Sequence, residues 1–467
     1  MNKYKKLSLN TIVVFLGTAG SKLISFIMLP FYTKYLSVSD YGVTDSINTY
    51  VSLLIGLVTM CTADAIFIYS NQENDKDKQR YFSSGLAIAF IGLCICSLAF
   101  IIAKIFFNEI GGVFVQYIWC IFFLLFTSFL QNYLQNFLKG LNRLVLFSLS
   151  GVLYTLFLAI LAILLIPMNG VMGFVYSMVF SNCLSTSVIL LCSKSYRYLN
   201  VKSINFSSVK ELLKYSVPLI PNSIMWWFLS ASNRPIMEKY VGLDGIGLYA
   251  IANKLPSLIV VIFTIFINSL IVSLLEEYNK DGFRKFYNKV FMFIFSAQVI
   301  LASFLTIFGT FLIKIITQNE SYWTAWHYIP LLSISVILSN SAAFFGCIFS
   351  VVKKTKYYFY SSVFGAITAL IGNIFLIKYF NVYGACFSVM FSNFILAFTR
   401  LLFSSKYAKI DKIYYYLIQL ISLGILSFVV IYQKKISFLI FILIIIVSII
   451  PAINTFIKLG KKNERKN

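Results

Sequence analysis

Charged side chains are scarce in this sequence, and acidic ones are the scarcest. Only 12% of the 467 residues are charged, with 16 acidic residues against 39 lysines and arginines and a single histidine. An ordinary soluble domain carries roughly 25% charged residues, so this chain cannot cover itself with a hydrated surface. No expected loop holds the paired carboxylates or histidine clusters that acid–base or metal chemistry requires. We therefore expect neither a soluble protein nor an enzyme.

The eight cysteines offer no framework for disulfides or metal. All of them fall inside or at the ends of apolar segments, and none is paired within a loop. Cys94 and Cys96 are two residues apart, which is not the spacing of a redox C-x-x-C motif. We interpret the cysteines as small apolar packing residues and expect no metal site and no cofactor.

Apolar residues dominate what is present. They make up 59% of the chain, the mean hydropathy is +0.85, and runs long enough to cross a ~30 Å hydrocarbon core recur from end to end. Backbone amides in lipid must pair within their own segment, which favours helices. The sequence predicts an all-α polytopic membrane protein with about fourteen spans, at residues 8–33, 43–70, 81–105, 114–138, 147–167, 172–193, 214–235, 247–275, 290–313, 325–351, 358–378, 385–405, 413–432 and 437–457.

Basic residues outside the spans are distributed unequally. The side that holds the N-terminus carries 28 lysines and arginines, and the opposite side carries seven. The positive-inside rule therefore places both termini in the cytoplasm, in a bacterial inner membrane. The net charge of +23 then reflects topology and attraction to anionic membrane lipids, and no nucleic-acid partner is expected. We also expect the first span to be uncleaved, since no small-residue cleavage site follows its short basic start.

Two sequence patterns occur twice. The pattern P-x3-K-Y-x6-G-x5-N-x3-S begins at Pro30 and again at Pro235, at a constant offset of 205 residues, and V-x-G-x3-S-x2-F-S-N begins at Val171 and again at Val382. The chain is therefore expected to hold two six-helix repeats, related by a pseudo-two-fold axis along the membrane normal. The predicted parts are an N-terminal half at 1–200, a cytoplasmic linker at 201–213, a C-terminal half at 214–405, and two additional helices with a basic tail at 406–467.

Short motifs give the chain a family resemblance. The segment Leu36–Gly42, which ends in Asp-Tyr-Gly, the Lys139–Arg143 loop and the duplicated V-x-G-x3-S segments resemble the polysaccharide exporters, or O-antigen (Wzx-type) flippases, of the multidrug/oligosaccharidyl-lipid/polysaccharide (MOP) superfamily. The resemblance implies a flippase that moves an undecaprenyl-diphosphate-linked oligosaccharide from the inner to the outer leaflet by alternating access, alongside polysaccharide polymerase machinery. A lipid II-type flippase and a MATE-type cation-coupled drug exporter remain alternatives.

Ionisable residues inside predicted spans mark the candidate site, because such residues are costly in hydrocarbon and tend to face a wet interior. Asp45 and Asp64 are candidates for ion coupling, and transport is expected to draw on the membrane potential, H+ or Na+. Lys22 could instead pair with Asp64, and Arg234 and Lys254 could snorkel outward, as we expect Arg400 to do at the cytoplasmic end of its span. The predicted substrate-binding residues are Lys22, Ser25, Asn48, Asn222, Arg234, Asn253 and Lys254.

Overall fold

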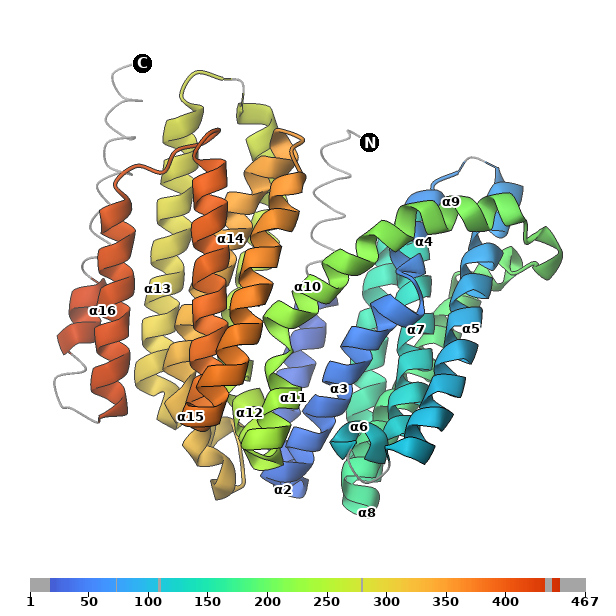
Figure 1. Cartoon of the computed structure of the whole chain (residues 1–467), viewed down its shortest axis with the longest axis horizontal. Coiled ribbons are helices and arrows are strands. Elements are labelled where there is room, and N and C mark those ends of the chain that lie inside the picture. The colour runs from blue at the N-terminus through green and yellow to red at the C-terminus, as the bar shows by residue number, and fades with distance from the viewer. Residues whose placement is uncertain (1–16, 73, 108–110, 279, 433–438, 446–467) are drawn as a thin grey trace. The chain divides into compact units, whose positions relative to one another are not determined.

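The computed structural model describes residues 17–72, 74–107, 111–278, 280–432 and 439–445 (Figure 1). Every regular element in these ranges is a helix, which confirms the predicted all-α fold class. The chain forms two compact units, Met1–Trp227 and Phe228–Asn467. The division falls inside α10 (Ile220–Ser230), within the seventh predicted span, so the halves bounded at 200 and 214 stay a prediction.

The helix Val38–Val58 of the first unit begins at a capping box. Ser37 and Asp40 form a reciprocal capping box, in which Asp40 N–H donates to Ser37 Oγ (3.1 Å) and Ser37 N–H donates to Asp40 Oδ2 (3.0 Å). The Asp-Tyr-Gly segment is therefore a helix start. The elements of this unit are a helical stretch at 17–27, α2 (Leu29–Tyr35), α3 (Val38–Val58), α4 (Thr62–Tyr69), α5 (Asp75–Phe106), α6 (Gly112–Gln116), α7 (Ile118–Gly140), α8 (Leu144–Cys192), η1 (Ser195–Tyr198), η2 (Val201–Ser203), α9 (Phe206–Ser216), η3 (Val217–Leu219) and α10.

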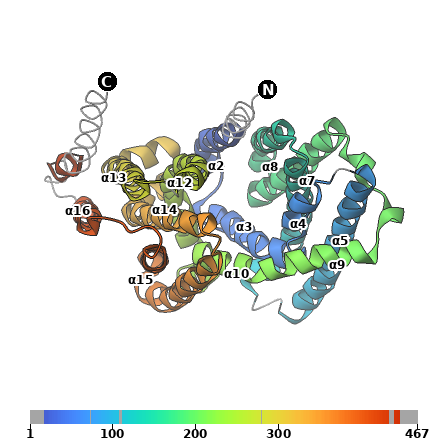
Figure 2. The same cartoon turned by 90° about the horizontal axis from the view of Figure 1, so that it is seen from above.

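The second unit is built from longer helices. Helices α12, α13 and α14 pack side by side, as the end-on view shows, and α14 packs on α15 (Figure 2). Helix α14 is buried along nearly its whole length, and its buried residues include Ser333, Asn340 and Ser341. The elements are α11 (Asn233–Tyr240), α12 (Leu243–Glu277), α13 (Phe283–Ile316), η4 (Glu320–Tyr328), α14 (Ile329–Val351), α15 (Lys356–Ser404) and α16 (Ile413–Ile431).

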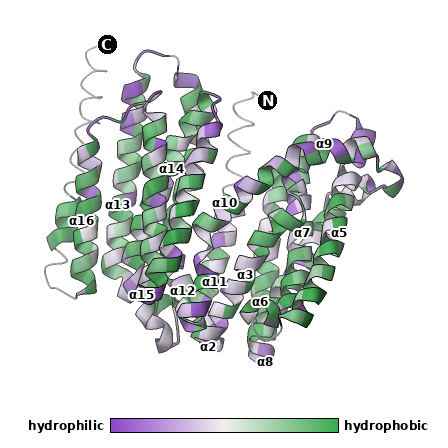
Figure 3. Cartoon of the chain, viewed as in Figure 1, coloured by the Kyte–Doolittle hydropathy of each residue, from purple (hydrophilic) through white to green (hydrophobic). Residues whose placement is uncertain are grey.

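The outward surfaces of the helices are apolar. On α5 the side chains of Phe90, Ile95, Leu98 and Ile105 are each about 60% exposed or more, and Figure 3 shows this helix as hydrophobic beyond its polar first turns. The interior holds serines and threonines whose hydroxyls donate to carbonyls of the preceding turn, as Ser177 Oγ does to Gly173 O at 2.7 Å. An apolar exterior over an interior in which many hydroxyls bond within their own helix suits a lipid solvent.

The two 49-residue helices α8 and α15 are equivalent and each contains a chain reversal. Backbone angles are non-helical at Gly170 (φ 51°, ψ −126°) and at Asn381 (φ 50°, ψ −129°), which are 211 residues apart. In α15, Ser388 Oγ donates to Ala369 O at 3.1 Å, although 19 residues separate them. Such contacts require two antiparallel halves. Each long element therefore supplies two of the predicted spans.

Equivalent contacts repeat in the two units. Asn182 Nδ2 donates to Ser128 Oγ at 3.0 Å, and Asn393 Nδ2 donates to Ser335 Oγ at 2.9 Å. Both asparagines belong to the duplicated V-x-G motif. The polar letters of that motif thus join the second half of each hairpin to a neighbouring helix, α7 or α14, and the repeat is present at the level of side-chain contacts.

Several predicted span boundaries need correction. Eight helices in the described ranges are long and apolar enough to cross a membrane, or nine if the bent pair α3 and α4 counts as one span. The segment 214–235 is not one helix, because Pro218, Pro221 and Pro235 divide it among α9, η3, α10 and α11. The fourteenth predicted span lies outside the described residues except for 439–445, as does the start of the first.

Candidate functional site

Lys22 lies on the helical stretch at 17–27, in the first unit. Its side chain is exposed, as is that of Ser25, whose hydroxyl donates to Ser21 O at 2.9 Å. An exposed ammonium in the interior of a membrane span is costly against hydrocarbon. The surface around Lys22 is therefore better suited to water or an anion than to lipid tails.

Helix α3 presents the next polar group, Asn48. Its side chain is exposed, and its amide donates to Thr44 O at 2.9 Å and lies 3.7 Å from Met178 Sδ on α8. Asp45, one turn earlier, is half-buried on the same helix. Asn222 is half-buried on α10, a helix anchored to α3 by the Trp227 indole, which donates to Thr49 O at 3.0 Å.

Asp64 on α4 has an electrostatic partner that the sequence did not suggest. Its carboxylate interacts with the ammonium of Lys139 at the end of α7, and that ammonium also lies 4.3 Å from the centroid of the Phe147 ring. The packing of α4 on α7 brings Lys139, 75 positions along the chain, near this carboxylate. Pairing of Asp64 with Lys22 and a role of Asp64 in ion coupling stay predictions.

Arg234 belongs to the second unit and is 8% exposed. Its Nη1 donates to Ser230 O at 2.8 Å and to Asn233 Oδ1 at 2.9 Å, and its guanidinium lies 4.8 Å from the centroid of the Tyr249 ring. These contacts hold the side chain within its own helices. Because it is buried in this way, Arg234 contributes to the packing of the second unit. Its predicted role in binding the substrate would be additional.

Lys254 and Asn253 lie on α12, the helix that follows α11 and its Arg234. Lys254 is exposed and Asn253 is half-buried. The exposed ammonium again lies within a span, 22 residues long at 243–264, that is apolar enough to cross a membrane. Lys254 is therefore an exposed cation on an apolar helix, and it belongs to the other unit from Lys22.

The expectation for Arg400 was wrong. Its side chain does not extend to the headgroup region but is 2% exposed. Its Nε donates to Ser361 Oγ at 3.1 Å, and its Nη1 donates to Ala342 O at 3.1 Å. The first half of the α15 hairpin supplies Ser361 and α14 supplies Ala342, and the Tyr358 ring centroid lies 5.1 Å from the guanidinium. Packing of the hairpin against α14, which no local sequence signal announces, encloses the guanidinium.

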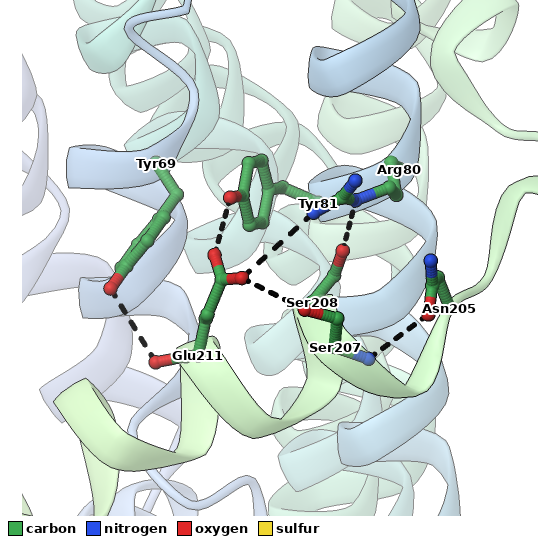
Figure 4. Close-up of polar contacts among 7 residues, drawn as sticks. All are labelled: Tyr69, Arg80, Tyr81, Asn205, Ser207, Ser208 and Glu211. Atoms are coloured by element: carbon green, nitrogen blue, oxygen red, sulfur yellow. Dashed lines mark hydrogen bonds and ion pairs between the residues drawn. The ribbon is translucent and has the colours of Figure 1, made fainter.

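A cluster at one end of the first unit fastens α9 to the ends of α4 and α5 (Figure 4). Tyr81 Oη donates to Glu211 Oε2 at 2.5 Å, Ser207 Oγ donates to Glu211 Oε1 at 3.1 Å, and Arg80 donates to Ser208 Oγ. These hydrogen bonds, first that from Tyr81, hold the pKa of the Glu211 carboxyl below its ordinary value. Helix α9 is thus attached by a network of charged and hydroxyl groups, and the linker role of 201–213 stays a prediction.

The fold is that of known MOP-superfamily transporters. The lipid II flippase MurJ, in an inward closed conformation, matches with a TM-score of 0.71 and 16% identity over 96% of this chain and all of that one. MATE in complex with MaL6 matches with a TM-score of 0.61 and 15% identity, and a MOP superfamily transporter from Pyrococcus furiosus with 0.60 and 16%; each comparison covers 86% of this chain and 95% of the other.

Sequence comparison identifies the family. The family model of polysaccharide biosynthesis proteins matches residues 7–271, which is more than half of the chain. The chain therefore belongs to that family, and the predicted resemblance is confirmed. No curated protein sequence matches the chain.

Proposed function

We propose that this protein is a flippase that carries an undecaprenyl-diphosphate-linked oligosaccharide, such as an O-antigen or other surface-polysaccharide repeat unit, from the inner to the outer leaflet by alternating access. Membership of a polysaccharide biosynthesis family supports a glycan substrate, and a fold shared with the lipid II flippase MurJ supports transport of a lipid-linked one. On this proposal the protein acts in a bacterial inner membrane with both termini in the cytoplasm.

The observation that carries the proposal is an exposed lysine in each unit, Lys22 inside the first predicted span and Lys254 on an apolar helix long enough to cross a membrane. A diphosphate that crosses hydrocarbon must exchange its water for other partners, and charge-assisted donors such as lysine stabilise it best. A cation exporter would need the opposite polarity. The polyprenyl tail is already soluble in the bilayer and needs no polar site.

The membrane potential supplies a driving force for an anionic substrate. Moving one negative charge outward across an inside-negative membrane gains about 2.3 kcal/mol per 100 mV. A diphosphate therefore requires no other coupling in principle. Coupling to H+ or Na+ through Asp45 or Asp64 would be an addition to this term.

The test is transport by the purified protein in vesicles that contain a fluorescent undecaprenyl-diphosphate oligosaccharide, with arrival in the far leaflet measured by chemical quenching. Lys22→Ala should abolish transport and Lys22→Arg should retain part of it. Lys254→Ala and Arg234→Ala should cause weaker losses, and Arg234→Ala should also reduce stability because the side chain is buried.

The matched control is Lys76→Ala, which removes an exposed lysine from the first turn of α5, and it should transport normally. Normal transport by all three alanine variants at normal protein levels would refute the cationic site. Equal transport of lipid II would favour the lipid II-type alternative, and transport of organic cations alone would favour the MATE-type alternative.

A further inference from the structure

A polar cavity of about 410 Å³ lies at the end of the first unit where α5 begins and α8 ends. It is lined by three basic residues, Arg143, Lys194 and Arg197, and by one acidic residue, Asp75. Asp75 already forms an ion pair with Lys78, whose Nζ lies 2.8 Å from its Oδ1. The cavity therefore keeps an excess of positive charge, and the proposed transport path does not use it.

The walls of this cavity are fixed by hydrogen bonds. Arg143 Nη1 donates to Ser193 O at 2.6 Å, which joins the start of α8 to its end. Gln79 Nε2 on α5 donates to the backbone carbonyl of Arg197 at 3.1 Å, and thereby holds η1 in place. Within the described residues the side chains of Lys194 and Arg197 form no ion pair. The Lys194 ammonium and the Arg197 guanidinium thus line a cavity with fixed walls, and neither is paired with a carboxylate in the described part of the chain.

An apolar groove of about 280 Å³ lies directly next to the cavity, in the same unit. Three elements, α5, α8 and η1, contribute residues to both. On α5, Gln79 lines the cavity, and Phe82, one turn further along, lines the groove. The η1 segment contributes Arg197 to the cavity and Tyr196 to the groove. The rest of the groove follows α7 and the second half of α8 inward to Asn182, ten residues or about 15 Å from the rim of the cavity.

The cationic cavity and the apolar groove together are complementary to an amphiphile with an anionic headgroup and an apolar tail. We propose that they bind one anionic phospholipid, whose phosphate lies among Arg143, Lys194 and Arg197 and one of whose acyl chains lies in the groove. Basic pockets between spans at the cytoplasmic surface hold anionic headgroups in this way. The positive-inside topology predicted above places this end of the unit at the cytoplasmic leaflet, where such lipids are available.

The test measures lipid binding to the purified full-length protein by native mass spectrometry, with phosphatidylglycerol against zwitterionic phosphatidylcholine. Phosphatidylglycerol should bind more tightly. The double variant Lys194→Asn with Arg197→Gln should weaken it by about thirtyfold, since each basic residue near an anionic group contributes about a factor of five. Asparagine is chosen at 194 because that residue has φ 55°, which asparagine tolerates.

The matched control, Lys202→Gln with Lys210→Gln, removes the same charge from neighbouring exposed positions outside the cavity and should leave the affinity unchanged. Cys183→Trp, which fills the groove, should weaken phosphatidylglycerol but not glycerol phosphate. Arg197→Gln alone should give about a fivefold loss if the double variant does not fold.

Three results would overturn the proposal. Equal binding of the two phospholipids would remove the role of charge, and equal losses in the two double variants would remove the role of this cavity. If inorganic phosphate displaced the lipid and Cys183→Trp had no effect, the cavity would be a site for free phosphate and the groove would not take part.

Discussion

The close approach within the two hairpins gives a quantitative test of the repeat. A Cβ atom added at Gly173 would lie 2.1 Å from the carbonyl oxygen of Leu165, and one added at Gly384 would lie 2.1 Å from that of Leu376. Both obstacles are backbone atoms of the preceding half of the same hairpin, so no flexible side chain can move aside. Gly173→Ala and Gly384→Ala should therefore destabilise their units equally.

The magnitude follows from the overlap. Overpacking by one methyl group costs about 1–3 kcal/mol where the neighbours cannot relax, and this exceeds the roughly 0.5–1 kcal/mol that alanine gains over glycine in a helix. For units of 150–250 residues, each kcal/mol shifts the melting temperature by about 2–4 °C. Because the overlap is with backbone, the upper end applies, with a net cost of about 2 kcal/mol, and we expect each variant to melt roughly 4–8 °C below the unsubstituted protein.

Thermal unfolding of the purified protein in detergent is the assay, with Gly424→Ala on α16 as the matched control. A Cβ at Gly424 would meet no atom within 4 Å, so this variant should melt at the same temperature or slightly higher. A melting temperature of Gly173→Ala or Gly384→Ala equal to that of the control would refute the close packing. A large difference between the two would refute their equivalence.

Two further substitutions test buried and surface polar networks. Arg400→Leu should destabilise the second unit by about 2–4 kcal/mol in thermal unfolding, because it leaves the buried acceptors of the guanidinium without a donor. Arg400→Lys should destabilise the unit less. Equal effects of the two substitutions would contradict this reasoning. Because the Glu211 pKa is lowered in the folded protein, the attachment of α9 is complete above the ordinary carboxyl pKa and is lost as pH falls through the lowered value. Hydrogen exchange of 206–216 should therefore rise below about pH 4, and in Glu211→Gln it should be faster at neutral pH and lose this acid dependence; an unchanged profile would contradict the assignment.

Sequence patterns predicted the features that depend on local chemistry. The apolar runs predicted the helices, and the duplicated V-x-G motif contained the glycine of each hairpin contact, Gly173 and Gly384. The repeat patterns did not predict the two reversal points, because Gly170 and Asn381 are different residues that share only a tolerance for positive φ. A search for identical letters could not pair them.

Long-range partners could not be predicted in the same way. Arg400 was expected at the headgroups because a span boundary can be counted along one helix, while its acceptors Ser361 and Ala342 lie 39 and 58 residues away. Asp64 and Lys139 come near enough to interact electrostatically through the packing of α4 on α7. For the candidate site, the sequence supplied which residues are ionisable at membrane depth, and the structure supplied which of them are enclosed.

The repeat separates polar residues that recur in both units from charged residues that occur in only one. Asn48 and Asn253 correspond at the offset of 205, as do Ser25 and Ser230, so these polar groups serve both units. The charged candidates do not correspond: the same offset places neutral residues opposite them, and one unit folds without the charge that the other carries. Packing therefore does not explain the exposed Lys22 and Lys254, which is the reason to test them for substrate binding, whereas the buried Arg234 also packs the second unit. The unmatched pairs are Lys22 with Trp227, Asp45 with Ala250, Arg234 with Leu29 and Lys254 with Thr49.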